Sequence, residues 1–379
     1  MCLENASSLL VSKLRGDGLL TFAAHSINFD QKGTQGQYRY HRLPYLKKGV
    51  QKQYTETMDQ IFDIYFDLIA KLTNYISTTS SLPKVQDSAE KQAYRVAKSV
   101  LPVAVTSNVD VFAPELALNS TAIRLLSDKM PEAREAGRKI LRTDLDKHQL
   151  LAIGYQALTR ENTKKITDKL LTHNNSSDDN SVTLIDIWPK DELDIVPDIL
   201  YENSSLSLNE IKKQVKAWST PKKSKVLKAY IGDRLSIDHK PGHALEKLHY
   251  SWDILGDYTT FVELQGRTTG DYLTWQNLTP RYGFDVPTLI ENAGLTDDFE
   301  KCFYLSLGLY SHMQQHGYEQ EAQYVTLFGH RMRWKINLTA NEAIDLMENS
   351  NTMKNSEIIK IMRKQISMVH PIIGESMIR

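Results

Sequence analysis

The sequence predicts a helix-rich α+β fold, and three observations support this class. Apolar side chains recur every three or four residues over 50–76, which is the period of one buried helix face. Similar helical patterns fill much of the remaining chain, whereas 182–188 combines β-branched residues with the alternation of a strand. The Gly-x-Gly-x-x-Gly pattern of doubly wound dinucleotide-binding folds does not occur in the sequence.

In the first half, helices are expected where the apolar period continues between proline-marked breaks. Pro102 separates two helical stretches, and Pro131 followed by Glu132 is typical of the first turn of a helix. The helices expected here cover 50–76, 88–100, 115–126 and 131–158.

In the second half, the strand 182–188 ends at Pro189 and helices follow it. Ser207 and Glu210 have the spacing of a capping box, and Thr220 with Pro221 marks the next helix start. The segment 259–265 is too short to assign to a strand or a helix. The helices expected here cover 207–218, 221–233, 287–292, 296–316, 340–349 and 355–369.

Charge and cysteine content restrict the class of protein. The chain has 379 residues, and its 46 Lys and Arg balance 46 Asp and Glu, so a broad basic surface for nucleic acid is not expected. Cys2 and Cys302 are too few for a disulfide framework, which favours a reducing cytoplasm. No stretch approaches the roughly 20 apolar residues of a membrane helix, so we expect no membrane partner.

Two domains are expected from the length, at roughly 150 residues per domain. The segment 173–181 is polar and aperiodic, which is typical of a linker or an exposed loop. The sequence therefore predicts a first domain at 1–172 and a second at 182–379.

Polar and aromatic side chains concentrate between Arg234 and Tyr282. Amides can read the edge of a planar heterocycle, arginine can pair with a phosphate, and aromatic rings can stack. The competing interpretation is a polar helix–loop junction punctuated by Pro280 and Gly283. A metal-binding set is the other possibility, but Pro241-Gly242 interrupts the helix that such a set needs, so no metal is expected. That set would comprise His239, His243, Glu246 and His249.

Two further groups of cations stand outside this cluster. Arg331 and Arg333 lie on the same side of the chain if the segment is extended, which suits a phosphate or a flavin pyrophosphate. A solvated edge strand is the alternative. In Tyr38-Arg39-Tyr40-His41-Arg42, aromatic and basic residues alternate, which favours stacking on a ring or a plain loop.

Several of these segments, in this order, resemble the flavin-dependent thymidylate synthases (ThyX), particularly long forms with two ThyX-like units. The family signature is Arg-His-Arg-x-x-Ser-x-Asn-Glu-x-Ser-x-Arg-Tyr. Here Arg281 and Tyr282 match its end, while Thr274, Gln276, Asn277 and Thr279 occupy its Ser, Asn, Glu and Ser positions. The long forms also look similar at 38–42, 100–102, 239–242, 257–265, 278–283, 322–325 and 329–333.

The resemblance implies reductive methylation of dUMP to dTMP, with methylenetetrahydrofolate as the carbon donor, FAD as cofactor and NADPH as reductant. It also implies a homo-oligomer whose two related units each have a small sheet flanked by long helices. The implied substrate-binding residues are Gln265, Thr274, Gln276, Asn277, Thr279, Arg281 and Tyr282. The implied cofactor-binding residues are Arg39, Arg42, His239, Lys240, Arg267, Arg331 and Arg333.

One departure from the family pattern separates two hypotheses. The Arg-His-Arg trio falls on Thr269-Gly270-Asp271, with only Arg267 nearby. Losing two cations weakens a polyanion site by several kcal/mol, at about 1.5–3 kcal/mol for each charged hydrogen bond. The first hypothesis is a divergent ThyX-type enzyme. The alternative is a non-catalytic ThyX homologue that binds a nucleotide or a partner protein.

Overall fold

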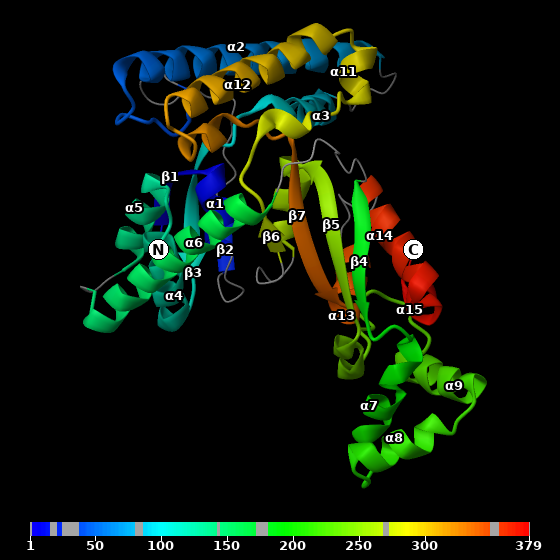
Figure 1. Cartoon of the computed structure of the whole chain (residues 1–379). Coiled ribbons are helices and arrows are strands. Elements are labelled where there is room, and N and C mark those ends of the chain that lie inside the picture. The colour runs from blue at the N-terminus through cyan, green and yellow to red at the C-terminus, as the bar shows by residue number, and fades with distance from the viewer. Residues whose placement is uncertain are drawn as a thin grey trace. The chain divides into compact units, whose positions relative to one another are not determined.

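The computed structural model in Figure 1 describes most of the chain. The described residues are 2–15, 21–24, 38–79, 86–141, 145–171, 181–267, 273–348 and 356–378. Nearly all of the expected linker, at 173–180, and the Thr269-Gly270-Asp271 segment lie outside them.

The chain forms two compact units. The first comprises Met1–Ser177, Asp257–Asp271 and Gln276–Met332, and the second comprises Asp178–Gly256, Tyr272–Trp275 and Arg333–Arg379. Whether these are two related ThyX-like units, with a boundary at 173–181, stays a prediction.

The first unit contains a three-stranded antiparallel sheet in the order β1 (Cys2–Ser7), β3 (Thr106–Phe112), β2 (Thr21–Ala24). The short helix α1 (Ser8–Leu14) follows β1, and the Ser7 hydroxyl caps it by accepting a hydrogen bond from the Leu10 N–H (3.0 Å). None of these elements was predicted from the sequence.

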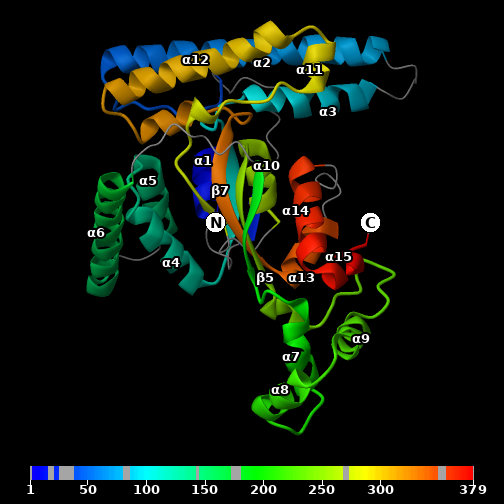
Figure 2. The ribbon, with the colours of Figure 1, turned by 45° about the vertical axis from the view of Figure 1, so that its right-hand side comes forward.

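Long helices form the second layer of this unit. In Figures 1 and 2, α2 (Lys48–Thr79) and α12 (Thr296–Gln315) lie side by side, and α3 (Gln86–Ala97) also packs against α2. The expected stripe of α2 is confirmed, because Met58, Phe62 and Leu72 are buried. The helical period of the apolar residues therefore correctly predicted α2, the longest helix of the unit.

The expected helix at 131–158 is wrong, because two helices occupy this region. The first, α5 (Pro131–Ile140), begins with proline as predicted, and α6 (Lys147–Leu170) begins at a capping box formed by Asp146 and Gln149. The Asp146 carboxylate and the Gln149 amide accept hydrogen bonds from backbone N–H groups, and a new helix therefore begins here. The helix α4 (Glu115–Leu126) has the predicted bounds.

The remaining elements of this unit are short. The ambiguous segment 259–265 is a helix, α10 (Tyr258–Gln265), because the Asp257 carboxylate caps it by accepting from the Thr260 N–H (2.8 Å). The others are η1 (Lys98–Val100), η5 (Pro280–Tyr282), α11 (Thr288–Asn292) and η6 (Glu321–Val325).

The second unit is built on a four-stranded sheet in the order β4-β5-β7-β6. The strands are β4 (Val182–Trp188), β5 (His249–Asp257), β7 (Arg331–Thr339) and β6 (Leu273–Trp275). The predicted strand 182–188 is confirmed. The extended form considered for Arg331 and Arg333 is observed in β7, whose Trp334 and Ile336 are buried.

Helices complete the second unit. Trp252 on β5 donates to the Gln365 side chain of α14 (3.0 Å), and the Tyr250 hydroxyl lies 2.8 Å from His370 Nδ1. The helical elements are η2 (Glu192–Ile195), α7 (Val196–Tyr201), α8 (Leu208–Lys216), α9 (Thr220–Ile231), η3 (His243–Lys247), α13 (Ala340–Glu348), α14 (Glu357–Val369) and α15 (Pro371–Ser376).

Many helices and two small antiparallel sheets confirm the α+β class. Among the described residues, no helix has both the length and the apolar content needed to cross a bilayer.

Candidate functional site

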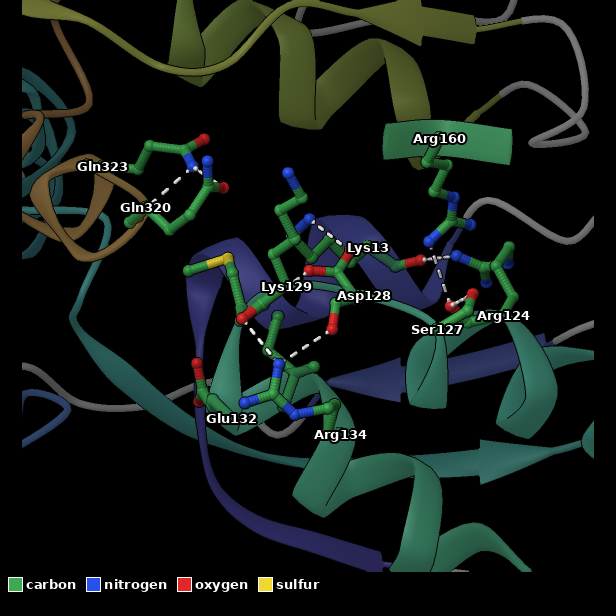
Figure 3. A network of polar contacts seen from close by, with 12 residues as sticks. Lys13, Arg124, Ser127, Asp128, Lys129, Glu132, Arg134, Arg160, Gln320 and Gln323 are labelled. Carbon is green, nitrogen blue, oxygen red and sulfur yellow. Dashed lines mark hydrogen bonds and ion pairs between the residues drawn. The ribbon is translucent and has the colours of Figure 1, made fainter. Parts of the chain in front are cut away.

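Five of the predicted nucleotide-binding residues lie on one loop of the first unit, Gln276–Asp285, which we call the site loop. They are Gln276, Asn277, Thr279, Arg281 and Tyr282. Hydrogen bonds from the loop's backbone N–H groups to two side chains fix its shape. The Leu278 N–H donates to Gln323 Oε1 (3.2 Å), and the Thr279 hydroxyl accepts from the Arg281 N–H (3.3 Å) at the start of η5. The Gln323 amide group donates to the Gln320 carbonyl (3.2 Å), as Figure 3 shows. The loop is therefore attached to a buried amide of η6.

The far end of the site loop is attached to the start of β7. Gly283 has φ +74°, a left-handed conformation that favours glycine. Its carbonyl accepts from the Arg331 N–H (2.9 Å), and Phe284 forms an antiparallel bridge with His330. Two separate segments of sequence thus meet at one turn.

Polar side chains cover the exposed side of the loop. Gln276, Asn277 and Arg281 are exposed. The Tyr282 hydroxyl donates to Gln276 Oε1 (3.2 Å), and Arg281 Nη2 donates to Gln314 Oε1 on α12 (3.0 Å). Among the described residues, no carboxylate pairs with Arg281. Its charge is therefore available to an anion.

Arg331 lies at the same turn but is already paired. Its Nε atom donates to Asp285 Oδ2 (3.0 Å), and its Nη2 atom bonds the other carboxylate oxygen. This two-point pair places a negative charge within the site loop itself. A phosphate has to displace Asp285 before it can use Arg331.

His330 supports the loop without taking part in proton chemistry. Its ring lies against Phe303 and Phe284, and its Nδ1 atom accepts from the Leu327 N–H (2.9 Å). Burial lowers the pKa of His330 to about 3. The imidazole is therefore neutral at physiological pH and acts as a packing group.

Gln265 and Thr274 do not join the site loop. Gln265 is buried at the end of α10 and donates to the Ser12 carbonyl (2.8 Å). Its Oε1 atom has no hydrogen-bond partner among the described residues. Thr274 belongs to β6 of the second unit, where it is paired with Lys335.

The predicted cations near the start of the chain belong to the first unit. Arg39 is exposed, and its carbonyl accepts from the Thr106 N–H (3.2 Å). Arg42 stacks on the Tyr40 ring, 3.7 Å from its centroid, and its Nη2 lies 3.9 Å from an Asp59 oxygen. The stacking considered for this segment is therefore intramolecular.

Arg267 is exposed just after α10. Its neighbours in the family motif, Thr269-Gly270-Asp271, are outside the described part of the chain.

The predicted residues of the second unit are also engaged. Lys240 pairs with Asp345 (3.0 Å), and Arg333 pairs with Asp253 (3.1 Å). His239 is exposed, and its Nδ1 accepts from the Leu235 N–H (3.3 Å). In the described residues, no three His, Cys, Asp or Glu side chains converge as a metal set would require.

These contacts bear on whether the chain can hold FAD. A flavin pyrophosphate needs uncompensated donors, but four predicted cofactor cations already face carboxylates. The described residues therefore fit a flavin only if these pairs are broken. The four are Arg42, Lys240, Arg331 and Arg333.

One buried carboxylate of the first unit, Glu132, was not predicted from the sequence. Glu132, on α5, accepts from the Ser7 N–H (2.8 Å), from the Ser7 hydroxyl (2.6 Å) and from the Tyr324 hydroxyl (2.6 Å). Burial, then the adjacent carboxylate, raise the pKa of Tyr324 well above its usual range. Tyr324 therefore keeps its proton and donates a hydrogen bond to Glu132.

Glu132 and His41 also border a cavity of about 310 Å³. His41 Nδ1 lies 3.6 Å from Glu132 Oε1. The sequence signal was weak, because a glutamate in the first turn of a helix is usually a dipole partner. Its buried partners lie 125 and 192 residues away.

Comparison with known proteins adds little to these observations. No family model matches the chain. The chain is similar to the UPF0159 protein of Chlamydia pneumoniae, with 22% identity over 367 residues, covering 90% of this chain and 68% of that protein.

Among solved structures, similarity is found to a UMP/dUMP methylase, PolB, of Streptomyces cacaoi, bound with 5-Br dUMP. The TM-score is 0.41 with 10% identity, over 52% of this chain and 93% of that chain. Similarity at this level carries no argument about this chain's fold or activity.

Proposed function

We propose that the chain binds a dUMP-like nucleoside monophosphate at the site loop. The observation that carries this proposal is the state of Arg281, which is exposed, held by an amide and not paired with a described carboxylate. A guanidinium in this state can form two parallel hydrogen bonds to a phosphate without first giving up an ion pair. Gln314 limits the rotation of its side chain.

The neighbouring side chains suit the remaining parts of such a nucleotide. Gln276 and Asn277 offer amide donors and acceptors, which match the alternating edge of a uracil ring. The Tyr282 hydroxyl, bonded to Gln276 (3.2 Å), holds that amide in place. The loop therefore supplies edge recognition and phosphate binding within a few residues.

The finer proposal is the reaction implied by the ThyX resemblance, FAD-dependent methylation of dUMP to dTMP. When bound, the flavin would supply the redox chemistry. The chain's own part would be to hold the nucleotide phosphate at Arg281 and to orient the base through Gln276. The paired cations favour the alternative, in which a ThyX homologue binds the nucleotide without catalysis.

Calorimetric titration of the full chain with nucleotides tests the binding proposal. We expect saturable binding of dUMP, and binding of deoxyuridine at least about 10-fold weaker, because one charged hydrogen bond contributes about 1.5–3 kcal/mol. Equal affinity for the two ligands, or no heat with dUMP, contradicts the proposal.

Titration with FAD, followed by visible absorbance, separates the enzyme from the binding protein. Saturable binding of FAD supports the methylation reaction, which a dUMP methylation assay with methylenetetrahydrofolate and NADPH then tests. Binding of dUMP without binding of FAD supports the non-catalytic alternative.

A further inference from the structure

The helices α7, α8 and α9 form a small group at one end of the second unit, as Figures 1 and 2 show. The helix α7 packs against both α8 and α9, and Val196, Ile211 and Val215 form a buried cluster within the group. The turn Ala217–Ser219 joins α8 to α9. Two helices joined by so short a turn have the connection length of the helix-turn-helix motif of DNA-binding proteins.

Lysine side chains concentrate on α8 and α9. Between Ser207 and Ile231 the sequence has seven lysines and one acidic residue, Glu210, so this segment has an excess of six positive charges. The neutral balance of the whole chain conceals this concentration. Among the described residues, only Lys228 of the seven forms an ion pair with a carboxylate, that of Glu375 (3.4 Å). The exposed members, which we call the lysine face, are Lys212, Lys213, Lys216, Lys222, Lys225 and Lys228.

The spacing of these lysines does not favour folding. On α8, Lys216 follows Lys213 by three residues and Lys212 by four, and on α9 Lys225 follows Lys222 by three. Side chains at these spacings are neighbours on a helix surface, where like charges are destabilising. Lys222 also lies in the first turn of α9, where the helix dipole disfavours a cation. Helix stability therefore does not account for the lysine face, whereas a bound polyanion would neutralise it.

The other side chains of α8 and α9 favour a nucleic acid duplex over a membrane or a single strand. From 208 to 231 no large apolar side chain is exposed, so these helices have nothing to insert between lipids. Single strands stack their bases on exposed aromatic rings. Here the Trp218 ring is half-buried, with the Lys222 ammonium 3.7 Å from its centroid. Tyr230 is also half-buried, and its hydroxyl accepts from the Ala244 N–H (3.0 Å).

We propose that the lysine face of α8 and α9 binds the phosphate backbone of duplex DNA. A duplex has one negative charge per about 1.7 Å of its axis, and each lysine that meets a phosphate releases a condensed counterion. The major groove admits an α-helix, and the 12 residues of α9 span about 18 Å. The helix α9 has no Arg, Asn or Gln to read base edges, so binding is independent of sequence.

Fluorescence anisotropy of a labelled DNA duplex of mixed sequence, about 20 base pairs or two helical turns long, tests the binding. The full chain is titrated into the duplex at several salt concentrations. We expect a dissociation constant in the micromolar range near 0.05 M salt. The logarithm of the affinity should fall with the logarithm of salt concentration at a slope of about −4 to −5, because five or six lysines release counterions.

Two double variants test whether both helices take part. We expect Lys212→Gln with Lys216→Gln on α8, and Lys222→Gln with Lys225→Gln on α9, each to weaken binding at least about 10-fold and to reduce the salt slope by about 2. Because all four side chains are exposed, circular dichroism should show unchanged helix content.

Two controls match these variants. Lys165→Gln with Lys169→Gln removes the same charge from exposed positions of α6, and it should leave the affinity within about twofold of the wild type. Lys222→Arg with Lys225→Arg keeps the charge of α9 and should bind like the wild type. The proposal is independent of the site loop, so Arg281→Ala should bind the duplex like the wild type.

Four results overturn the proposal. The first is the absence of an anisotropy change at low salt. The second is a loss in the α6 control equal to the loss in the lysine-face variants, or a loss in only one of the two lysine-face variants. The third is tighter binding to a single-stranded oligonucleotide of the same sequence. The fourth is binding to phosphatidylserine vesicles, in a co-sedimentation assay, without binding to the duplex.

Discussion

Arg331 and Asp285, 46 residues apart, form a two-point ion pair that closes the end of the site loop, with Nε 3.0 Å from Oδ2. Asp285 follows Arg281 by four residues in the site loop, and the Arg281 guanidinium contacts the Gln314 amide instead of a carboxylate. Arg281 and Arg331 therefore differ in whether a carboxylate already neutralises the guanidinium. This difference is why we assign the phosphate to Arg281.

Removing the acid of this pair should strengthen anion binding. We predict that Asp285→Asn raises the affinity for dUMP several-fold, because it removes a negative charge from the site loop. The cost in folding stability should stay below about 1 kcal/mol, since both side chains are partly exposed. Calorimetry with dUMP measures the first effect and urea unfolding the second. Unchanged or weaker dUMP binding would contradict the assignment.

The carboxylate of Glu132 should be a major contributor to stability. We predict that Glu132→Gln lowers the free energy of unfolding by about 2–3 kcal/mol, because its hydrogen bonds with Ser7 and Tyr324 lose a charged acceptor in a buried place. The control is Glu135→Gln, an exposed carboxylate one turn later on α5. Urea unfolding of both variants makes the comparison, and equal losses would argue against the buried network.

The buried imidazole of His330 should make stability depend on pH. Its pKa is about 3 in the folded chain, against 6.5 for an ordinary histidine, so below pH 6.5 the unfolded chain binds a proton that the folded chain does not. This histidine therefore lowers the free energy of unfolding by up to about 1.4 kcal/mol per pH unit between pH 6.5 and 3.

His330→Gln isolates this effect, because the glutamine oxygen can still accept from the Leu327 N–H. We expect the variant to lose less stability than the wild type when the pH falls from 7 to 5 in urea unfolding. Parallel pH profiles for the two proteins would show that His330 does not titrate in this range.

Arg234, the first residue of the polar cluster 234–282, should contribute to the free energy of unfolding. It forms two hydrogen bonds, each 2.7 Å, with the buried Glu348, which also accepts from the Ile378 N–H. Arg234→Met leaves that carboxylate buried without its cation, and we predict a loss of about 3–5 kcal/mol. Lys240→Met, at an exposed pair, should cost below about 1 kcal/mol. Similar losses in thermal unfolding would refute the distinction.

The sequence predicted the helices better than the strands. The apolar stripe of α2 and the first residues of α8 and α9 depend on residues close in sequence, so the sequence alone could predict these helices. Strand β5 alternates too, with Tyr250, Trp252 and Ile254 buried, but its polar residues drew attention to a binding cluster instead. Strand β1 pairs with β3 about a hundred residues later, and no local signal marks that partner.

The same distinction applies to the site. The residues from Gln276 to Tyr282 lie together because they form one turn, which a motif can reveal. Whether a cation is available depends on tertiary contacts, and the acids that neutralise Arg331 and Arg333 come from 46 and 80 residues away. Spacing along the chain could not distinguish these arginines from Arg281.

The most direct test of the nucleotide site is the dUMP dissociation constant of Arg281→Ala, measured by calorimetry beside Arg138→Ala, an exposed arginine on α5. We predict that Arg281→Ala binds dUMP at least about 10-fold more weakly than the wild type, because a charged hydrogen bond to phosphate is lost. Arg138→Ala should bind like the wild type, and deoxyuridine should bind equally to all three proteins. An unchanged dissociation constant in Arg281→Ala would show that the site loop does not hold the phosphate.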